Sequence, residues 1–86
     1  MSAKIVSYDV DQTVPLPTCY KDISDMLESY THAKITQSCW VIDTRESCRI
    51  IHRKLKRIMN SQDRLFVADL GENVKCHNII DKDAFN

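Results

Sequence analysis

Glycine is nearly absent from this sequence of 86 residues, since Gly71 is the only one. A Walker A loop, a G-x-G-x-x-G dinucleotide turn and a G-x-S-x-G nucleophile elbow each require at least two glycines. The composition therefore excludes nucleotide kinases, Rossmann dehydrogenases and α/β-hydrolases.

Long apolar segments are also missing. No stretch approaches the run of about eighteen apolar residues that a membrane-spanning helix needs. The N-terminal segment Met-Ser-Ala-Lys-Ile-Val-Ser-Tyr-Asp is too short, and becomes charged too soon, to be a signal peptide. We therefore expect a cytoplasmic protein without a membrane partner.

The sequence also lacks a C-x-x-C motif. Its four cysteines are widely separated: Cys19, Cys39, Cys48 and Cys76. A secreted disulfide framework would be denser in cysteine. In a reducing compartment we expect free thiols, several of them buried as small apolar groups.

A net charge is missing as well, since twelve basic and twelve acidic side chains cancel. The charges are unevenly distributed along the chain. Residues 1–33 carry two basic and five acidic groups, residues 34–66 eight and three, and residues 67–86 two and four. The middle of the chain is therefore basic, between two acidic ends.

The apolar fraction of 43% is that of an ordinary globular protein. The length allows one small domain over residues 1–86. Residues 4–10 are β-branched and aromatic and predict a first strand. Two prolines place residues 11–17 in a loop, and Thr18 is the expected N-cap of a helix. Its apolar stripe is Tyr20, Ile23, Leu27 and Tyr30.

Residues 33–43 are too long for one strand and predict two strands joined by a turn near Gln37 and Ser38. Thr44 is expected to cap a second helix starting at Arg45. Residues 64–70 predict a fourth strand, and residues 74–80 a short extra one. The apolar stripe of the second helix is Cys48, Ile51, Leu55, Ile58 and Met59.

This order of elements predicts an α+β fold. Strand, helix, two strands, helix and strand form the β-α-β-β-α-β plan, with the short extra C-terminal strand after it. In such a chain two helices cover one face of a four-stranded antiparallel sheet, and we expect a ferredoxin-like domain.

The second helix carries most of the positive charge. Helical spacing puts most of its basic residues on the side away from the apolar stripe. Such a face can lie along phosphates, and the alternative is a solvated helix surface. The helix has no interleaved aromatic residues, so base stacking on the helix itself is not indicated. The basic residues are Arg45, Arg49, Arg53, Lys54, Lys56 and Arg57.

Other polar and aromatic residues give weaker signals. The histidines His32, His52 and His77 follow no zinc-site spacing, and we expect structural or surface roles for them. Trp40 is expected in the core or in a dimer interface.

Asp9 is the carboxylate with the clearest catalytic interpretation, since it ends the first strand beside a loop. Carboxylates there are oxygen ligands of the kind that Mg²⁺ prefers, and a two-fold dimer would bring two copies together. The alternative is that Asp9 only ends the strand by accepting backbone hydrogen bonds. The neighbouring Tyr8 would contribute its hydroxyl.

Three segments together resemble a known family. Residues 5–9, Ile-Val-Ser-Tyr-Asp, are similar to the opening strand of the small CRISPR-associated adaptation subunits, and closer still to short SinR-family proteins. Residues 35–42 are similar to the middle strands of that family, and residues 60–67 to the segment that enters its last core strand. These blocks occur in the family's order through most of residues 4–70.

The resemblance implies a ferredoxin-like homodimer. Some adaptation subunits, and some of the related virulence-associated D toxins, are Mg²⁺-dependent nucleases, and the aspartate ending strand one is their metal-associated residue. That residue corresponds to Asp9. The expected function is a metal-dependent endonuclease acting preferentially on RNA, or a protein that binds RNA or DNA. In it Tyr8 and Ser7 shape the site, and the nucleic-acid-binding residues are Arg49, Arg53 and Arg57.

The alternative is a non-catalytic interaction module. Such a module would dimerise and bind a protein or nucleotide partner in microbial or phage defence. The neutral net charge favours this alternative, because nucleic-acid-binding proteins are usually basic.

Overall fold

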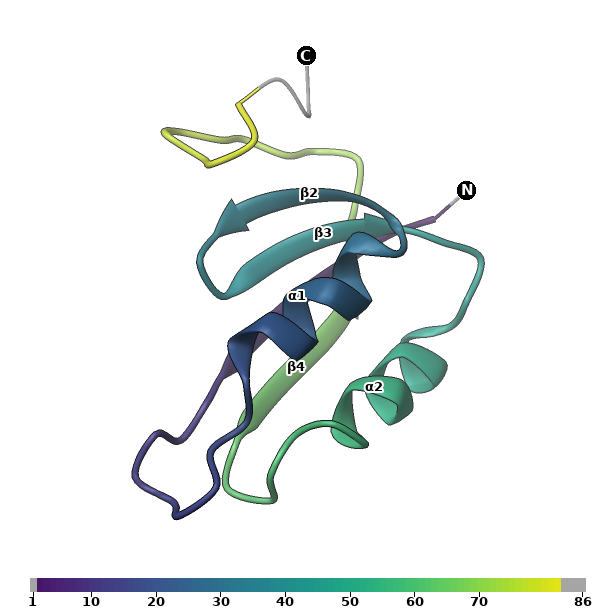
Figure 1. Ribbon diagram of the computed structural model, residues 1–86. Coiled ribbons are helices and arrows are strands. Elements are labelled where there is room, and N and C mark those ends of the chain that lie inside the picture. The colour runs from purple at the N-terminus through teal and green to yellow at the C-terminus, as the bar shows by residue number, and fades with distance from the viewer. Residues whose placement is uncertain (1, 83–86) are drawn as a thin grey trace.

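Two helices and four strands make up the protein in a computed structural model that describes residues 2–82 (Figure 1). No helix in that range is long and apolar enough to cross a membrane. The elements in chain order are β1 (Ala3–Asp9), α1 (Tyr20–Glu28), β2 (Thr31–Thr36), β3 (Cys39–Asp43), α2 (Cys48–Lys56) and β4 (Arg64–Asp69).

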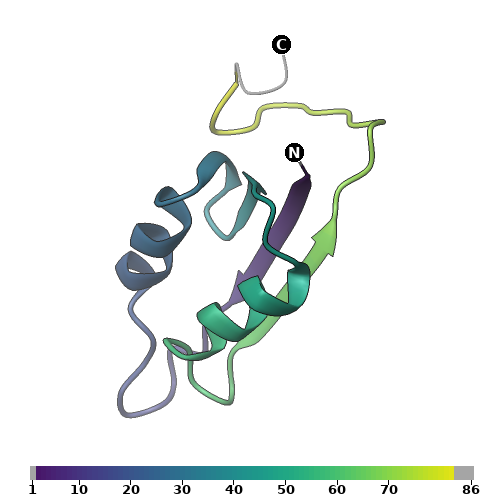
Figure 2. The ribbon, with the colours of Figure 1, turned by 90° about the vertical axis from the view of Figure 1, so that its right-hand side faces the viewer.

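The strands form one antiparallel sheet in the order β2-β3-β1-β4, so the predicted α+β class is confirmed. Both helices lie on the same side of this sheet (Figure 2). We call the opposite side the open face. In β1 the side chains of Val6 and Tyr8 are buried toward the helices, whereas Ile5, Ser7 and Asp9 alternate onto the open face.

The core lies between the sheet and the helices. Trp40, which is 1% exposed, belongs to this core, as expected. Its indole Nε1 donates a hydrogen bond to the Tyr8 hydroxyl at 3.0 Å, so the buried N–H is satisfied. The other fully buried large side chains are Val6, Ile23, Leu27, Ile42, Ile51 and Leu55.

The predicted turn at Gln37 and Ser38 is confirmed, because β2 ends at Thr36 and β3 begins at Cys39. The pairing of these strands shifts register between Lys34 and Thr36, as a β-bulge does.

Both predicted helix caps are wrong. The residue before α1 is Cys19, which makes no side-chain capping bond, while the Thr18 hydroxyl donates to Asp63 instead. The cap of α2 is Ser47, whose hydroxyl accepts from the Ile50 N–H, so this helix starts three residues later than expected. The Thr44 hydroxyl accepts from the Glu46 N–H in the turn before it.

The predicted extra strand at residues 74–80 is wrong. The C-terminal segment, residues 70–82, is irregular. It includes Asn78 at a φ of 53°, a left-handed conformation that an extended strand does not contain. The segment runs from β4 across to β2 (Figure 2). There the backbone N–H groups of Ile80 and Asp81 donate to the Ile35 and Lys34 carbonyls, and the Asp81 carboxylate accepts from the Lys34 N–H.

Candidate functional site

The predicted basic face of α2 is present in the structure. Ile51 and Leu55 are buried against the sheet, so the opposite side of the helix faces outward. Arg49, Arg53 and the C-cap Arg57 follow one another at four-residue spacing on this exposed side. They line a shallow hollow of about 420 Å³, the basic groove, which is formed by Arg49, His52, Arg53, Lys56 and Arg57.

Among the described residues, the arginines of this groove have no acidic side chain as a partner. None of the ion pairs formed within residues 2–82 involves Arg49, Arg53, Lys56 or Arg57. Like charges four residues apart on a helix destabilise it by about 0.2–0.5 kcal/mol per pair. The arrangement therefore costs stability in the free protein, and an anion bound in the groove would relieve that repulsion.

Lys54 has a different role from its basic neighbours. Its ammonium group forms an ion pair with Glu46 at 2.5 Å, and the same carboxyl group accepts a hydrogen bond from the Tyr30 hydroxyl. Mainly because of the bond from Lys54, the pKa of Glu46 is lower than usual. Lys54 thus joins α2 to the end of α1 and is not available to the groove.

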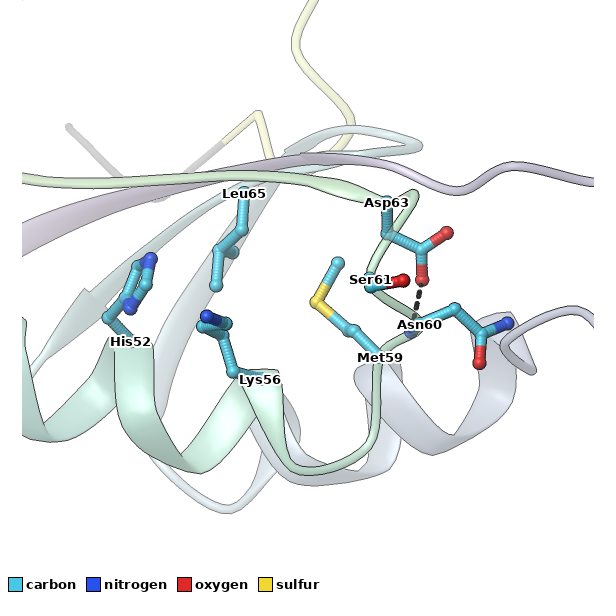
Figure 3. A pocket seen from close by; sticks show the side chains of 7 residues that line it. All are labelled: His52, Lys56, Met59, Asn60, Ser61, Asp63 and Leu65. Carbon is cyan, nitrogen blue, oxygen red and sulfur yellow. Dashed lines mark hydrogen bonds between the residues drawn. The ribbon is translucent and has the colours of Figure 1, made fainter.

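A second hollow, the α2–β4 pocket, lies beside the basic groove. It has a volume of about 440 Å³ and shares His52 and Lys56 with the groove. Figure 3 shows these two side chains extending from α2 toward Leu65 of β4. The remaining lining residues come from the connection between α2 and β4: Met59, Asn60, Ser61 and Asp63.

Asp63 closes one end of this pocket through three hydrogen bonds. Its Oδ1 accepts from the Asp11 N–H at 2.8 Å, and its Oδ2 accepts from the Thr18 hydroxyl and from the Asn60 N–H. Partial burial acts to raise the pKa of Asp63, but the three hydrogen bonds outweigh it and lower the pKa. The carboxylate is therefore already occupied by the protein's own donors.

Asp9 lies on the open face, at the end of β1. Its side chain is 71% exposed, and its Oδ2 is 3.7 Å from Nη1 of Arg64, the residue opposite it in β4. Within residues 2–82 no group of three or more histidine, cysteine or acidic side chains is placed to hold a metal ion. At Asp9 one chain therefore supplies a single carboxylate, with the Arg64 guanidinium beside it.

The other two expected catalytic residues are separated by the pleat of β1. Ser7 shares the open face with Asp9, but Tyr8 points into the core. The Tyr8 hydroxyl donates to the Gln37 carbonyl at 3.2 Å, and burial raises the pKa of this tyrosine. Tyr8 and Asp9 do not meet, and α2 lies on the other side of the sheet from Asp9.

Comparison of the chain with protein-family models, with curated proteins and with solved structures finds no match in any of the three.

Proposed function

We propose that this protein binds nucleic acid through the basic groove of α2. The observation that carries the proposal is the row of Arg49, Arg53 and Arg57, exposed and without acidic partners within residues 2–82. Arginine guanidinium groups bind phosphate oxygens in bidentate geometry, and several on one helix match a polyanion. Because the chain as a whole is neutral, the attraction for a polyanion would come from this local cluster and not from the net charge.

The fold that we propose is the one that the sequence resemblance implies. We take the fold to be ferredoxin-like, which the strand order β2-β3-β1-β4 and the placement of both helices on one face support. We also propose a homodimer of the kind found in the CRISPR adaptation subunits. Phe66 supports this, since it is 60% exposed on the open face beside Ser7.

The test of binding compares two variants with equal loss of charge. In one variant Arg49, Arg53 and Arg57 become glutamine; in the other Lys21, Lys75 and Lys82 become glutamine. Fluorescence anisotropy with a labelled single-stranded oligonucleotide is followed over a salt series. Each lost phosphate contact reduces the steepness of the fall of log affinity with log salt by about 0.7. The slope of the arginine variant should therefore be about 2 less steep than that of the unmodified protein.

The lysine variant should keep the slope of the unmodified protein. Equal losses in the two variants would mean that only the net charge matters. No binding by the unmodified protein at low salt would reject nucleic-acid binding altogether.

A second candidate function is a Mg²⁺-dependent endonuclease with Asp9 as the metal-associated residue. It is favoured by the exposure of Asp9 at the end of a strand, next to Ser7 on the open face. Since one chain supplies a single carboxylate, we place this site between two copies that face each other across the open face and contribute one Asp9 each. Tyr8 would then support the site from behind, through its bonds in the core.

Asp9→Ala is a clean test of the nuclease. Its ion pair with Arg64 is exposed, and such pairs contribute only about 0–1 kcal/mol to stability, so the variant should fold. Labelled single-stranded RNA and double-stranded DNA are incubated with Mg²⁺, with Mn²⁺ or with EDTA. Cleavage that requires the metal and is lost in Asp9→Ala, but kept in Asp22→Ala, would support the enzyme.

A folded protein that neither binds nor cleaves these nucleic acids in any metal would favour the remaining alternative. In that case the protein is a non-catalytic dimeric module that binds a protein or nucleotide partner in microbial or phage defence. The neutral net charge and the single carboxylate at Asp9 support this alternative.

A further inference from the structure

The basic groove and the α2–β4 pocket are adjacent hollows. His52 and Lys56 line both hollows, with the arginines on one side of them and the turn after α2 on the other. A chain of phosphates lying along the groove therefore passes the mouth of the pocket. Whatever is attached to those phosphates is placed at its entrance.

The pocket has two kinds of lining. Met59 and Leu65 are partly buried and pack against the core, so they offer an apolar floor. The half-buried imidazole of His52 forms a wall beside Leu65 (Figure 3). Imidazole rings are among the groups on which unstacked bases stack. The volume of about 440 Å³ falls in the range of roughly 300–1,000 Å³ for small-molecule sites.

The rim of the pocket is polar and is held in place. The Asn60 side-chain amide donates to the Leu16 carbonyl at 2.8 Å, and its backbone N–H donates to Asp63, so the rim keeps its position without a ligand. Ser61 is exposed and can exchange hydrogen bonds with the polar edge of a ligand. Because Asp63 already accepts three hydrogen bonds, its charge is partly compensated where an anionic ligand would approach.

We propose that the α2–β4 pocket receives an unstacked base of a single-stranded nucleic acid whose phosphates lie in the basic groove. The proposal rests on the proposed nucleic-acid binding and adds the preferred form of the substrate. A base in a duplex is stacked and paired and cannot enter a pocket beside the helix, whereas a base in a single strand can turn into it.

The test uses three labelled probes of equal length: a single-stranded oligoribonucleotide, a duplex of the same sequence and an abasic strand with the same phosphates. Anisotropy titrations at one fixed salt concentration give their affinities. The single strand should bind about tenfold more tightly than the abasic strand, as expected when one base is stacked. The duplex should bind more weakly than the single strand.

Ser61→Leu places an apolar side chain at the mouth of the pocket. The substitution should weaken single-strand binding about five- to tenfold, with abasic binding unchanged. Gln62→Leu is the matched control, since Gln62 is the next exposed residue of the same turn and does not line the pocket. It should leave all three affinities unchanged, and thermal unfolding of both variants confirms that they fold.

Two failures are distinguishable. Equal affinity of the unmodified protein for the base-containing and abasic single strands would overturn the base pocket and leave phosphate binding in the groove intact. No binding of any probe would overturn the proposed nucleic-acid binding itself. The comparison of probes requires no variant, so it decides the matter even if Ser61→Leu does not fold.

Discussion

Asp63 is the residue that joins the loop after β1 to the connection between α2 and β4. Its partners Asp11 and Thr18 lie 52 and 45 residues away in sequence, and Asn60 lies three residues away. No local pattern predicts contacts at such separations, so Asp63 could not be selected from the sequence alone. The only local signal is its ability to accept the backbone N–H three residues earlier, as aspartates do in turns.

We expect Asp63→Ala to lower the free energy of unfolding by about 2–3 kcal/mol. The half-buried Asp11 N–H and the buried Thr18 hydroxyl lose their acceptor, and the Asn60 N–H keeps only the Thr18 hydroxyl oxygen. Urea denaturation measures the loss. Asp25→Ala is the control, since its exposed ion pair with Lys21 contributes only about 0.3–0.5 kcal/mol. A similar loss in both variants would contradict the role of Asp63.

The same carboxylate predicts a pH dependence. Its pKa is lower in the folded protein than the value of about 3.9 in an unfolded chain. The stabilisation is therefore fully present above about pH 5 and is lost as the pH falls through the folded pKa. The difference in stability between the protein and Asp63→Asn should be constant near neutral pH and should shrink below about pH 4, as measured by urea denaturation at each pH.

At the scale of the element, the arginines of α2 that are proposed to bind phosphates also affect the stability of the helix. Its buried residues Ile51 and Leu55 hold it on the sheet, while its outward arginines repel one another. Arg53 lies in the last turn, where a positive charge is favourable with the helix dipole by about 0.3–1 kcal/mol. The two effects are of similar size and opposite sign.

Arg53→Gln should therefore change the free energy of unfolding by less than about 0.5 kcal/mol, because relief of repulsion and loss of the dipole interaction nearly cancel. Its affinity for a single-stranded oligonucleotide should nevertheless fall severalfold. Lys54→Gln should behave in the opposite way. It should lower the free energy of unfolding because the ion pair with Glu46 is lost, and it should weaken oligonucleotide binding less than Arg53→Gln does. Thermal unfolding and anisotropy on both variants check the contrast.

The strands and helices themselves could largely be predicted from the sequence. Alternating β-branched residues mark β1, and the apolar spacing marks the buried faces of both helices. The residues at which the helices start could not be predicted. Thr18, Thr44 and Ser47 are all chemically suitable caps, and tertiary contacts decide which of them is used. Neighbouring side chains of a strand point to opposite faces of the sheet, so Tyr8 is buried while Asp9 lies on the open face. This separation could be predicted from the sequence.

The site was predictable to a smaller extent. The arginines of α2 follow helical spacing, so their common face could be inferred from sequence alone. The α2–β4 pocket could not be inferred from the sequence, because it depends on how a helix, a turn and a strand pack together. Helical spacing places His52 between the apolar and basic sides of this helix, but its position between the two hollows depends on how the elements pack.

At the scale of the whole molecule, the C-terminal segment covers part of the open face. A cavity of about 490 Å³ lies beneath it, with Ile5 and Val41 of the sheet on one side and Val74 and Ile79 on the other. Ile79 is 9% exposed, whereas the adjacent Ile80 is 47% exposed. One isoleucine therefore anchors the segment, and its neighbour does not.

Ile79→Asp should detach the segment and lower the free energy of unfolding by about 1.5–3 kcal/mol, the value of one buried aliphatic side chain. Ile80→Asp should have little effect, since that side chain remains largely in solvent. Denaturation gives the stability, and binding of a hydrophobic dye reports exposure of the open face. Similar dye binding by the two variants would contradict the anchoring role.

The attachment of this segment to β2 also makes the two edge strands of the sheet different, because backbone groups on the outer side of β2 are hydrogen-bonded to it. Outer strands present unpaired backbone groups to which another chain can add. Along β2, carbonyls of Lys34 and Ile35 already accept hydrogen bonds from residues 80 and 81. The outer side of β4 has no neighbouring strand within residues 2–82. An added strand would therefore pair more readily along β4, and the sheet would extend in one direction only.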